Sequence, residues 1–380
     1  MSYDAYLAIN ASPYLRRMGM DDLLPKASIV TASQVYATVI SHDNQYLALG
    51  IYNQPYLEIY DMASETKIDN VPSLPYYVNG PCLAFSPDGK RLYCGLYASP
   101  FLTIVNLETF GIISSGITLP SFPTGLSLSP DGKRLIFYFS NNTYPVVIDT
   151  DSMTVVDTNN VFPVYIYGGA FNEDGSVFYV STTVSPYLRV IRTADWTQIS
   201  STNNVPTYSS LEFASGYLFC RRTNGAGFGV FDSSLNEVPE ATALITRQIM
   251  AMKASPDGRY MLFFFTSNTY PKAVRLRIGD WRIEPVDALS LATFGVNDIA
   301  ISRPEFKRIY GTVRDKDGNP AQRTVRIFHR GNGRMVAEQQ SDATTGDYEA
   351  SVVAGEYDVV AMAADGENLN DLIYARVTPE

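Results

Sequence analysis

The sequence predicts an all-β protein. Aromatic residues make up 12% of the 380-residue chain, with 26 Tyr and 19 Phe, and aromatic side chains fit the pleated surface of a sheet. Hydrophobic residues reach 46% and charged residues only 18%. The chain therefore has enough apolar side chain for a packed core, which excludes general disorder.

An internal repeat is the strongest signal in the sequence. The turn Ser86-Pro87-Asp88-Gly89 recurs as Ser129-Pro130-Asp131-Gly132 and as Ser255-Pro256-Asp257-Gly258. Together with weaker copies, the third turn position recurs in steps of 41 to 45 residues, at Asp43, Asp88, Asp131, Asp174, Ser215 and Asp257. A period of roughly 40–45 residues with four short strands indicates the blade of a β-propeller.

Each repeat can be divided into four strands, a to d. In the second repeat we expect strand a at Leu83–Ser86, strand b at Arg91–Tyr97, strand c at Phe101–Asn106 and strand d near Ile112–Ser114. The Pro-Asp-Gly segment makes the a–b turn, because Pro presets φ and Gly accepts a positive φ. A second turn, b–c, repeats as Pro followed by an aromatic residue.

The two ends of the repeat region complete each other. Ser12-Pro13-Tyr14 copies the b–c turn but has no strand a before it, whereas Asp298–Ser302 has the character of a strand a without its c and d. We expect a seven-bladed propeller over residues 1–308, closed by N- and C-terminal strands, which removes exposed sheet edges. Arg308–Gly311 also resembles a strand b, but we expect the N-terminal segment to supply b, c and d.

The period ends near residue 309, so residues 309–380 are predicted to form a second domain. The expected strands are Ile309–Arg314, Arg323–Arg330, Met335–Gln340, Gly346–Val353 and Tyr357–Ala361. They alternate apolar and polar residues as half-buried strands do. A short all-β run of this kind favours a small Ig-like or prealbumin-like β-sandwich.

This second domain resembles a small Ig-like module found at the ends of tailed-bacteriophage structural proteins. The resemblance rests on Gly311-Thr312-Val313, Gly318-Asn319-Pro320, Thr345-Gly346-Asp347-Tyr348 and, most specifically, on the final segment from Asn368 to Pro379. The repeats are similar to YVTN and WD40-type propellers. They lack the Gly-His and Trp-Asp pairs of WD40 repeats, since Asp195-Trp196 and Asp280-Trp281 are reversed, so this second resemblance implies fold only.

Net charge and sequence composition exclude several classes of function. The net charge is −10 and no basic stripe occurs, so we expect no nucleic-acid binding. The N-terminus lacks the features of a secretory signal, and the longest apolar run, Tyr260–Phe265, is too short to cross a membrane. We expect synthesis and folding in the host cytoplasm, without membrane insertion, and a structural role for the three cysteines, Cys82, Cys94 and Cys220, although a Cys82–Cys94 disulfide is conceivable.

The sequence offers no catalytic, metal or cofactor site, so we expect a protein that is not an enzyme. His42 and His329 have no partner Cys or His at metal-ligand spacing. Asp315-Lys316-Asp317-Gly318 is similar to the start of a calcium loop, but the bidentate Glu is missing and an ordinary hairpin is favoured. No nucleophile, base and oxyanion donor come together in the sequence.

The two ends of the propeller differ in chemistry. The a–b turns collect Asp, Lys and Arg, while the b–c turns and the loops that link blades collect Tyr, Phe, Pro and Asn. We infer candidate partner- or glycan-binding residues on this second end: Tyr56, Phe101, Tyr144, Tyr187, Tyr270, Tyr76, Phe122, Tyr165 and Tyr208. Tyr suits protein interfaces and sugar binding alike, and packing between blades is the third interpretation.

The resemblance to phage proteins implies a virion structural protein of the tail, neck, fibre or capsid surface that docks onto other virion proteins in many copies. The alternative is an adhesin for host attachment, which binds a host-surface glycan or receptor.

Overall fold

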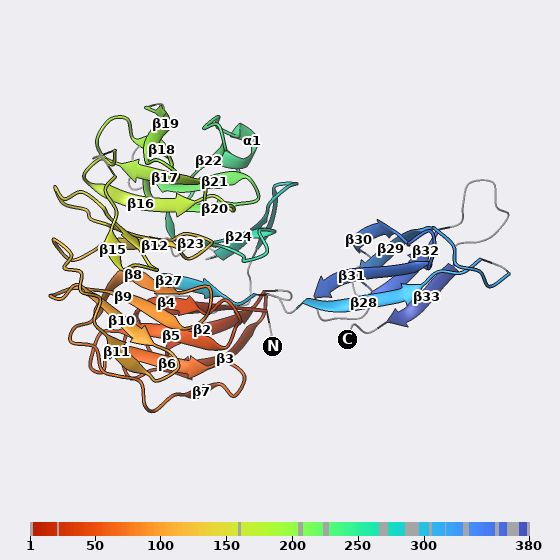
Figure 1. Ribbon diagram of the computed structural model, residues 1–380, viewed down its shortest axis with the longest axis horizontal. Helices are drawn as coiled ribbons and strands as arrows, with labels where there is room; N and C mark the ends of the chain where they lie inside the picture. The colour runs from red at the N-terminus through yellow and green to blue at the C-terminus, as the bar shows by residue number, and fades with distance from the viewer. Residues whose placement is uncertain are drawn as a thin grey trace. The chain divides into compact units, whose positions relative to one another are not determined.

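The computed structural model describes residues 3–20, 23–158, 161–203, 208–222, 228–265, 273–285, 296–303, 306–315, 317–329, 334–353, 357–362 and 372–377. The chain divides into two compact units, Met1–Arg303 and Pro304–Glu380. Both units consist of antiparallel sheets (Figure 1). The protein is therefore an all-β protein, as predicted.

The first unit is built from successive sheets whose strands follow one another in sequence. The first three sheets are β4 (Val35–Ile40), β5 (Tyr46–Ile51), β6 (Leu57–Asp61), β7 (Thr66–Lys67); β8 (Val78–Phe85), β9 (Arg91–Leu96), β10 (Leu102–Asn106), β11 (Gly111–Ile113); and β12 (Gly125–Leu128), β13 (Arg134–Tyr138), β14 (Val146–Asp149), β15 (Thr154–Val155). The next three are β16 (Ile166–Phe171), β17 (Val177–Thr182), β18 (Leu188–Arg192), β19 (Thr197–Thr202); β20 (Tyr208–Ala214), β21 (Tyr217–Arg222), β22 (Phe228–Asp232); and β23 (Ile249–Ala254), β24 (Tyr260–Phe265), β25 (Ala273–Arg277), β26 (Arg282–Pro285). The predicted order a–b–c–d is thus observed in five of these sheets, and a–b–c in the described part of the β20–β22 sheet.

A further sheet joins the two ends of the unit. Its strand order is β27 (Val296–Ile301), β1 (Asp4–Ile9), β2 (Tyr14–Gly19), β3 (Pro25–Val30). The pairing of β1 with β27 shows that the N-terminal segment supplies strands b, c and d beside a C-terminal strand a, as expected. Arg308–Gly311 belongs instead to β28 (Phe306–Thr312) of the second unit, which begins before the predicted boundary at residue 309.

The first strands of these sheets contact one another in a closed cycle, β4–β8–β12–β16–β20–β23–β27 and back to β4. Side chains bridge neighbouring first strands. Asn297 Nδ2 donates to the Val35 carbonyl at 2.8 Å, Asn79 Nδ2 to the Pro123 carbonyl at 2.7 Å and Ser127 Oγ to the Gly169 carbonyl at 2.9 Å. The first strands therefore surround the middle of the unit.

The recurring Ser-Pro-Asp-Gly sequence makes the same hydrogen bonds in different sheets. Ser86 Oγ donates to Asp88 Oδ1 at 2.5 Å and accepts from the Arg91 N–H at 2.9 Å. Asp88 Oδ1 also accepts from the Lys90 N–H, and the same set recurs at Ser129 and Ser255. The repeated Asp residues therefore fix a turn, since a short polar side chain bonds its own backbone nearby.

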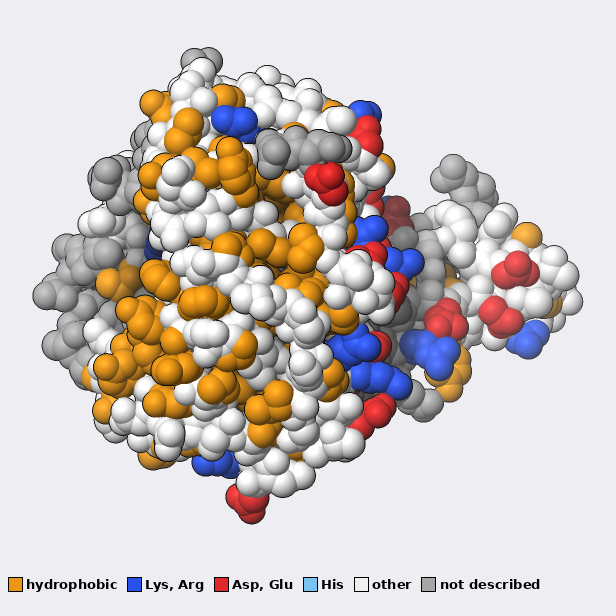
Figure 2. All heavy atoms as spheres, turned by 60° about the vertical axis from the view of Figure 1, so that its left-hand side comes forward, with side chains coloured by type: hydrophobic (Ala, Val, Ile, Leu, Met, Phe, Trp, Pro, Cys, Tyr) orange, Lys and Arg blue, Asp and Glu red, His pale blue; other side chains and the backbone are white. Residues whose placement is uncertain are grey.

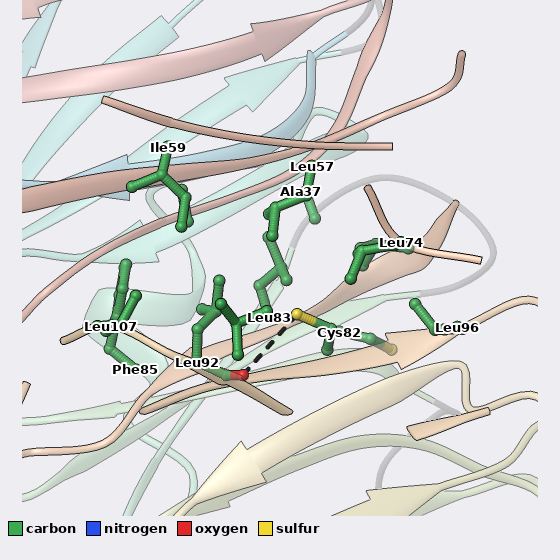
Figure 3. Close-up of a cluster of buried hydrophobic side chains, with 14 residues drawn as sticks. Ala37, Leu57, Ile59, Leu74, Cys82, Leu83, Phe85, Leu92, Leu96 and Leu107 are labelled. Atoms are coloured by element: carbon green, nitrogen blue, oxygen red, sulfur yellow. Dashed lines mark hydrogen bonds between the residues drawn. The ribbon is translucent and has the colours of Figure 1, made fainter. Parts of the chain in front are cut away.

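Apolar clusters between neighbouring sheets hold the unit together. One cluster combines Ala37 and Ile59 of the β4–β7 sheet with Cys82, Phe85 and other residues of the β8–β11 sheet (Figure 3). Its members are almost fully buried, so neighbouring sheets pack face to face through the side chains of alternate strand positions. Cys82, Cys94 and Cys220 are buried, which fits the predicted structural role, and Cys82 and Cys94 form no disulfide.

The sheet β20–β22 has three strands among the described residues, and its outer edge is covered differently. The short helix α1 (Pro239–Thr242) and the residue before it lie along β22. The Val238 N–H donates to the Val230 carbonyl at 2.8 Å, and the Val230 N–H donates to Thr242 Oγ1 at 3.1 Å. Both backbone groups of Val230 are therefore satisfied without a fourth strand.

The second unit contains two sheets. One pairs β28 with β31 (Asp347–Val353), and the other has the order β30 (Arg334–Gln340), β29 (Thr324–His329), β32 (Tyr357–Ala361), β33 (Leu372–Val377). Ile309 of β28, Ile327 of β29, Ala350 of β31 and Val359 of β32 share one buried cluster. The two sheets therefore enclose a common core, and the five predicted strands are present, Tyr357–Ala361 with its predicted bounds and the other four with shifted ends.

Candidate functional site: an aromatic row and a central cavity

The two ends of the first unit differ as the sequence predicts. Figure 2 shows hydrophobic side chains spread over one face of this unit, whereas Lys, Arg, Asp and Glu gather toward its edge. The strand directions explain the difference. First strands begin and second strands end at the aromatic end, while the a–b turns with their Asp, Lys and Arg residues lie at the opposite end.

A continuous row of aromatic rings lies at the aromatic end, across three neighbouring sheets. Tyr36 and Tyr52 meet edge to face with ring centroids 5.6 Å apart, and Tyr52 lies 5.6 Å from Tyr77. Tyr77 stacks on Tyr97 at 4.9 Å, and Tyr97 stacks on Phe122 at 5.2 Å. Tyr52, Tyr97 and Phe122 are 49%, 45% and 37% exposed, so the row forms part of the surface. We call these five residues the aromatic row.

Backbone pairing places these rings side by side. Tyr97 directly follows β9 and Tyr77 precedes β8, and the Tyr97 N–H donates to the Tyr77 carbonyl at 3.1 Å. Tyr52 follows β5 in the same way and donates to the Gln34 carbonyl at 2.9 Å. Packing against neighbouring rings buries part of Tyr77, which raises the pKa of its hydroxyl. Tyr52 and Tyr97 thus occupy the same position after strand b in consecutive repeats, whereas Gln34 takes the place that Tyr77 has in the next repeat.

Of the nine candidate residues, Phe122 belongs to the aromatic row. Three others, from the b–c turns, are half-buried and pack against apolar clusters: Tyr56, Phe101 and Tyr187. Tyr56 and Phe101 have φ values of 67° and 60°, each after a cis-proline. For these three residues the packing interpretation describes the side chain best.

The remaining candidates lie apart from the row or outside the description. Tyr144 is 53% exposed and Tyr76 is 44% exposed. Tyr165 is half-buried with φ at 58°. Tyr208 begins β20, but its side chain lies outside the described part of the structure, as does all of Tyr270.

A polar cavity of about 570 Å³ lies among the first strands, all of which contribute to its lining. Three charged residues on successive first strands face it: Glu212 of β20, Lys253 of β23 and Asp298 of β27. Lys253 Nζ contacts Glu212 Oε1 at 2.8 Å. Asp298 Oδ2 accepts from the Thr38 N–H at 2.9 Å and its Oδ1 from the Ile299 N–H at 2.9 Å.

The cavity changes the acidity of these groups. The Glu212 carboxylate raises the pKa of the Lys253 ammonium, because the opposite charge stabilises the protonated form. Burial raises the pKa of the Asp298 carboxyl to about 6 despite its two N–H donors and the nearby Lys253. Asp298 is therefore a carboxyl group close to its protonation midpoint at mildly acidic pH.

The other groups considered from the sequence have structural surroundings. Arg303 Nη2 donates to His42 Nε2 at 2.5 Å, and burial lowers the pKa of His42. Asp315 Oδ1 accepts from the Asn319 N–H at 2.8 Å within a turn, and the side chain of His329 lies outside the described residues. Within the described ranges, no three His, Cys, Asp or Glu side chains gather as metal ligands would.

Sequence reasoning missed Tyr36, Tyr52, Tyr97 and the charged residues of the cavity. The signal for the row was the recurrence of Tyr directly after strand b, at Tyr52 and Tyr97. The signal for the cavity was a charge in strand a. At this level of strand a, two neighbouring repeats carry the charged residues Glu212 and Lys253. The other repeats carry small or apolar side chains there, namely Val39, Ala84, Ser127, Ala170 and Ala300.

Neither known families nor curated proteins match this sequence. In the part of the chain that the structure describes, no helix has the length and apolarity needed to span a bilayer. Solved structures do match in fold. A functionally unknown protein from Desulfotomaculum acetoxidans DSM 771 matches with a TM-score of 0.61 at 14% identity, over 80% of this chain and 100% of that chain.

Two enzymes are also similar in fold. Dihydro-heme d1 dehydrogenase NirN matches with a TM-score of 0.56 at 11% identity, over 91% of this chain and 75% of that chain. Kuenenia stuttgartiensis hydrazine synthase matches with a TM-score of 0.50 at 15% identity, over 70% of this chain and 89% of that chain. The neighbours are β-propeller proteins, and at these identities the similarity extends to the fold alone, so this chain is similar to β-propellers in architecture.

Proposed function

We propose that this protein is a non-enzymatic docking component whose aromatic row binds a partner protein. The observation that carries the proposal is the row itself: five rings joined by contacts from one ring to the next, with three of them more than a third exposed. Tyr supplies large, rigid contact area with few rotatable bonds, and such residues dominate binding energy at protein interfaces.

We also propose a specific architecture for each of the two units. The closed cycle of first strands and the sheet shared by both ends support a seven-bladed propeller over residues 1–303. The two sheets with a common core support an Ig-like module in residues 304–380. A closed ring is a rigid platform, so a partner that binds the row does not have to order it first.

Ring geometry favours a protein over a sugar at this site. Sugar binding requires an open aromatic face, but Tyr97 is stacked on Tyr77 at 18° and on Phe122 at 27° between ring planes. Both faces of the Tyr97 ring therefore contact other rings of the row, and a partner would contact ring edges and hydroxyl groups. Hydroxyl groups at ring edges suit hydrogen bonds to a protein backbone.

We propose no catalytic role for Lys253 of the cavity. Its described lining contains no His or Cys, and its Lys253 is held by Glu212 in an ion pair at 2.8 Å. An engaged ammonium group of raised pKa is a poor nucleophile or base at neutral pH. If the protein were an enzyme, as two of its fold neighbours are, the purified protein would turn over a substrate.

The location that we propose is the particle of a tailed bacteriophage, on a tail, neck, fibre or capsid surface. This part rests on the resemblance of the second unit to phage modules, whose most specific segment contains β33. Many identical copies would make individually weak contacts strong together. Quantitative mass spectrometry of purified particles should find the chain in many copies, and its absence from particles would remove this location.

Tyr97→Ala tests the docking site directly, because Tyr97 contacts both Tyr77 and Phe122 and is 45% exposed. We expect the variant to fold and to lose incorporation into particles. The matched control is Tyr144→Ala, an equally exposed Tyr at 53% without a ring contact among the described residues. If both variants incorporate normally, the row is not the docking site, and binding of the intact protein on a glycan array would favour the adhesin alternative.

A further inference from the structure

The central cavity contains an uneven charge arrangement that the docking function does not use. Glu212, Lys253 and Asp298 lie on three consecutive first strands and face the same cavity. Lys253 is the ion-pair partner of Glu212 at 2.8 Å. Asp298 has no cation within ion-pair distance among the described residues and is held by two backbone N–H groups.

Arg221, the other cation that lines the cavity, is engaged elsewhere. Its Nη1 donates to the Met250 carbonyl. The negative charge of Asp298 is therefore not neutralised by direct contact with either cation. An uncompensated carboxylate away from bulk water is costly, and the equivalent level of β4 and β23 carries Ala37 and Ala251 instead.

A second polar group beside Asp298 lacks a partner. Thr38 is 5% exposed, lines the cavity and gives its backbone N–H to Asp298 Oδ2. Its side-chain Oγ1 is buried and makes no hydrogen bond among the described residues. Buried hydroxyl groups without a partner are rare in folded proteins and call for an explanation such as an ion or ligand group.

We propose that the Asp298 and Thr38 pair is a binding site for a small organic cation, a protonated primary amine that enters the central cavity. A primary ammonium group has three N–H donors. One donates to the Asp298 carboxylate and neutralises its charge, and rotation of the buried Thr38 side chain toward the cavity lets its Oγ1 accept a second. A cavity of about 570 Å³ is within the range of small-molecule sites.

The geometry selects an amine over other charged ligands. A carboxylate or phosphate would meet Asp298 and Glu212, and Lys253 is already paired with Glu212. A quaternary ammonium group has no N–H donor for Asp298 or Thr38. The site should therefore distinguish n-butylammonium from tetramethylammonium at equal charge and ionic strength.

Saturation-transfer difference NMR with the full-length protein tests this inference, with n-butylammonium chloride as the probe and tetramethylammonium chloride as the comparison. We expect saturation of n-butylammonium by the unmodified protein, at least five times less with Asp298→Asn, and unchanged saturation with Asp151→Asn, which removes an exposed carboxylate from another turn. No saturation by the unmodified protein, or equal saturation with Asp298→Asn, would overturn the proposal.

A second measurement does not depend on a variant. Asp298 faces Glu212 and Lys253, with Arg221 at the cavity wall and no charged residue from Thr38 to Ile40 of β4. Protonation of the Asp298 carboxyl removes the charge that attracts the amine, so saturation should fall about tenfold between pH 7.5 and pH 5. A constant signal over this range contradicts an amine site at Asp298 and leaves the docking function untouched.

Discussion

Asp4 and Ser302 are joined by hydrogen bonds although 298 positions separate them in sequence. The Asp4 N–H donates to Ser302 Oγ at 2.7 Å, and the Ser302 N–H donates to the Asp4 carbonyl at 2.8 Å. The Asp4 carboxylate, fully buried, binds Arg17 Nε at 2.6 Å and Lys26 Nζ at 2.5 Å. One residue therefore links the strands that close the ring.

Asp4→Asn should destabilise the first unit strongly. The substitution leaves Arg17 and Lys26 against a neutral, buried amide, and breaking a buried charge pair costs about 3–5 kcal/mol. Urea denaturation followed by tyrosine fluorescence measures the loss. Asp195→Asn, which breaks an exposed pair with Arg192, is the control and should change the unfolding midpoint little. Equal midpoints for the two variants would show that the closing network does not hold the ring.

The serine of the a–b turn should contribute more to the free energy of unfolding than an ordinary surface serine. Ser86 is 6% exposed, and its Oγ is the acceptor for the Arg91 N–H at 2.9 Å. Ser86→Ala leaves that N–H without its partner, so we expect a loss of about 1–3 kcal/mol. Ser234→Ala, in an exposed turn, should leave the free energy of unfolding nearly unchanged in the same urea titration.

Neighbouring a–b turns touch each other at a glycine. Gly132 has φ at 74°, and a Cβ there would lie 2.5 Å from Pro87 Cδ of the previous turn. Gly116 has φ at 66° with no atom within 4 Å. Both Ala variants bear the left-handed strain of about 1–2 kcal/mol, but only Gly132→Ala also pushes two turns apart. Thermal melting should therefore place Gly132→Ala below Gly116→Ala, and equal melting temperatures would argue against contact between the turns.

Asp298 makes stability depend on pH in a predictable direction. Burial raises its pKa to about 6, above the value of about 3.9 in an unfolded chain. Its contribution is therefore fully present below about pH 4 and is lost as pH rises through 6. Asp298→Asn removes that loss and should raise the free energy of unfolding at pH 8 by about 1–3 kcal/mol relative to the unmodified protein. At pH 4 the two proteins should unfold alike in guanidinium chloride, and a difference of the same size at both pH values contradicts a raised pKa.

The ring could be predicted from sequence because its repeat is carried by local turn chemistry. Ser86, Asp88 and Gly89 recur together since each has a fixed role in one turn. The joined ends were predictable as well, because an isolated b–c turn at Ser12-Pro13-Tyr14 needs a strand a from elsewhere. Repetition makes such local features visible several times over.

The surface was harder to predict because it depends on the direction of each side chain. Tyr56 and Phe101 follow a proline in a turn, which suggests exposure, but each packs against an apolar cluster. The aromatic row joins residues from different repeats, Tyr52, Tyr97 and Phe122, that only the pairing of strands brings together. The cavity likewise required the register that sets Glu212 beside Lys253 on a neighbouring strand.

Site-specific photo-crosslinking in cells that produce the native partners tests the docking surface most directly. A benzophenone side chain is placed at Tyr97 in the row, at Tyr144 as an exposed tyrosine outside it, and at Lys90 in an a–b turn at the charged end. The account predicts one discrete protein adduct from position 97 and no such adduct from positions 144 and 90. The same adduct at equal yield from all three positions, or none from position 97, would contradict it.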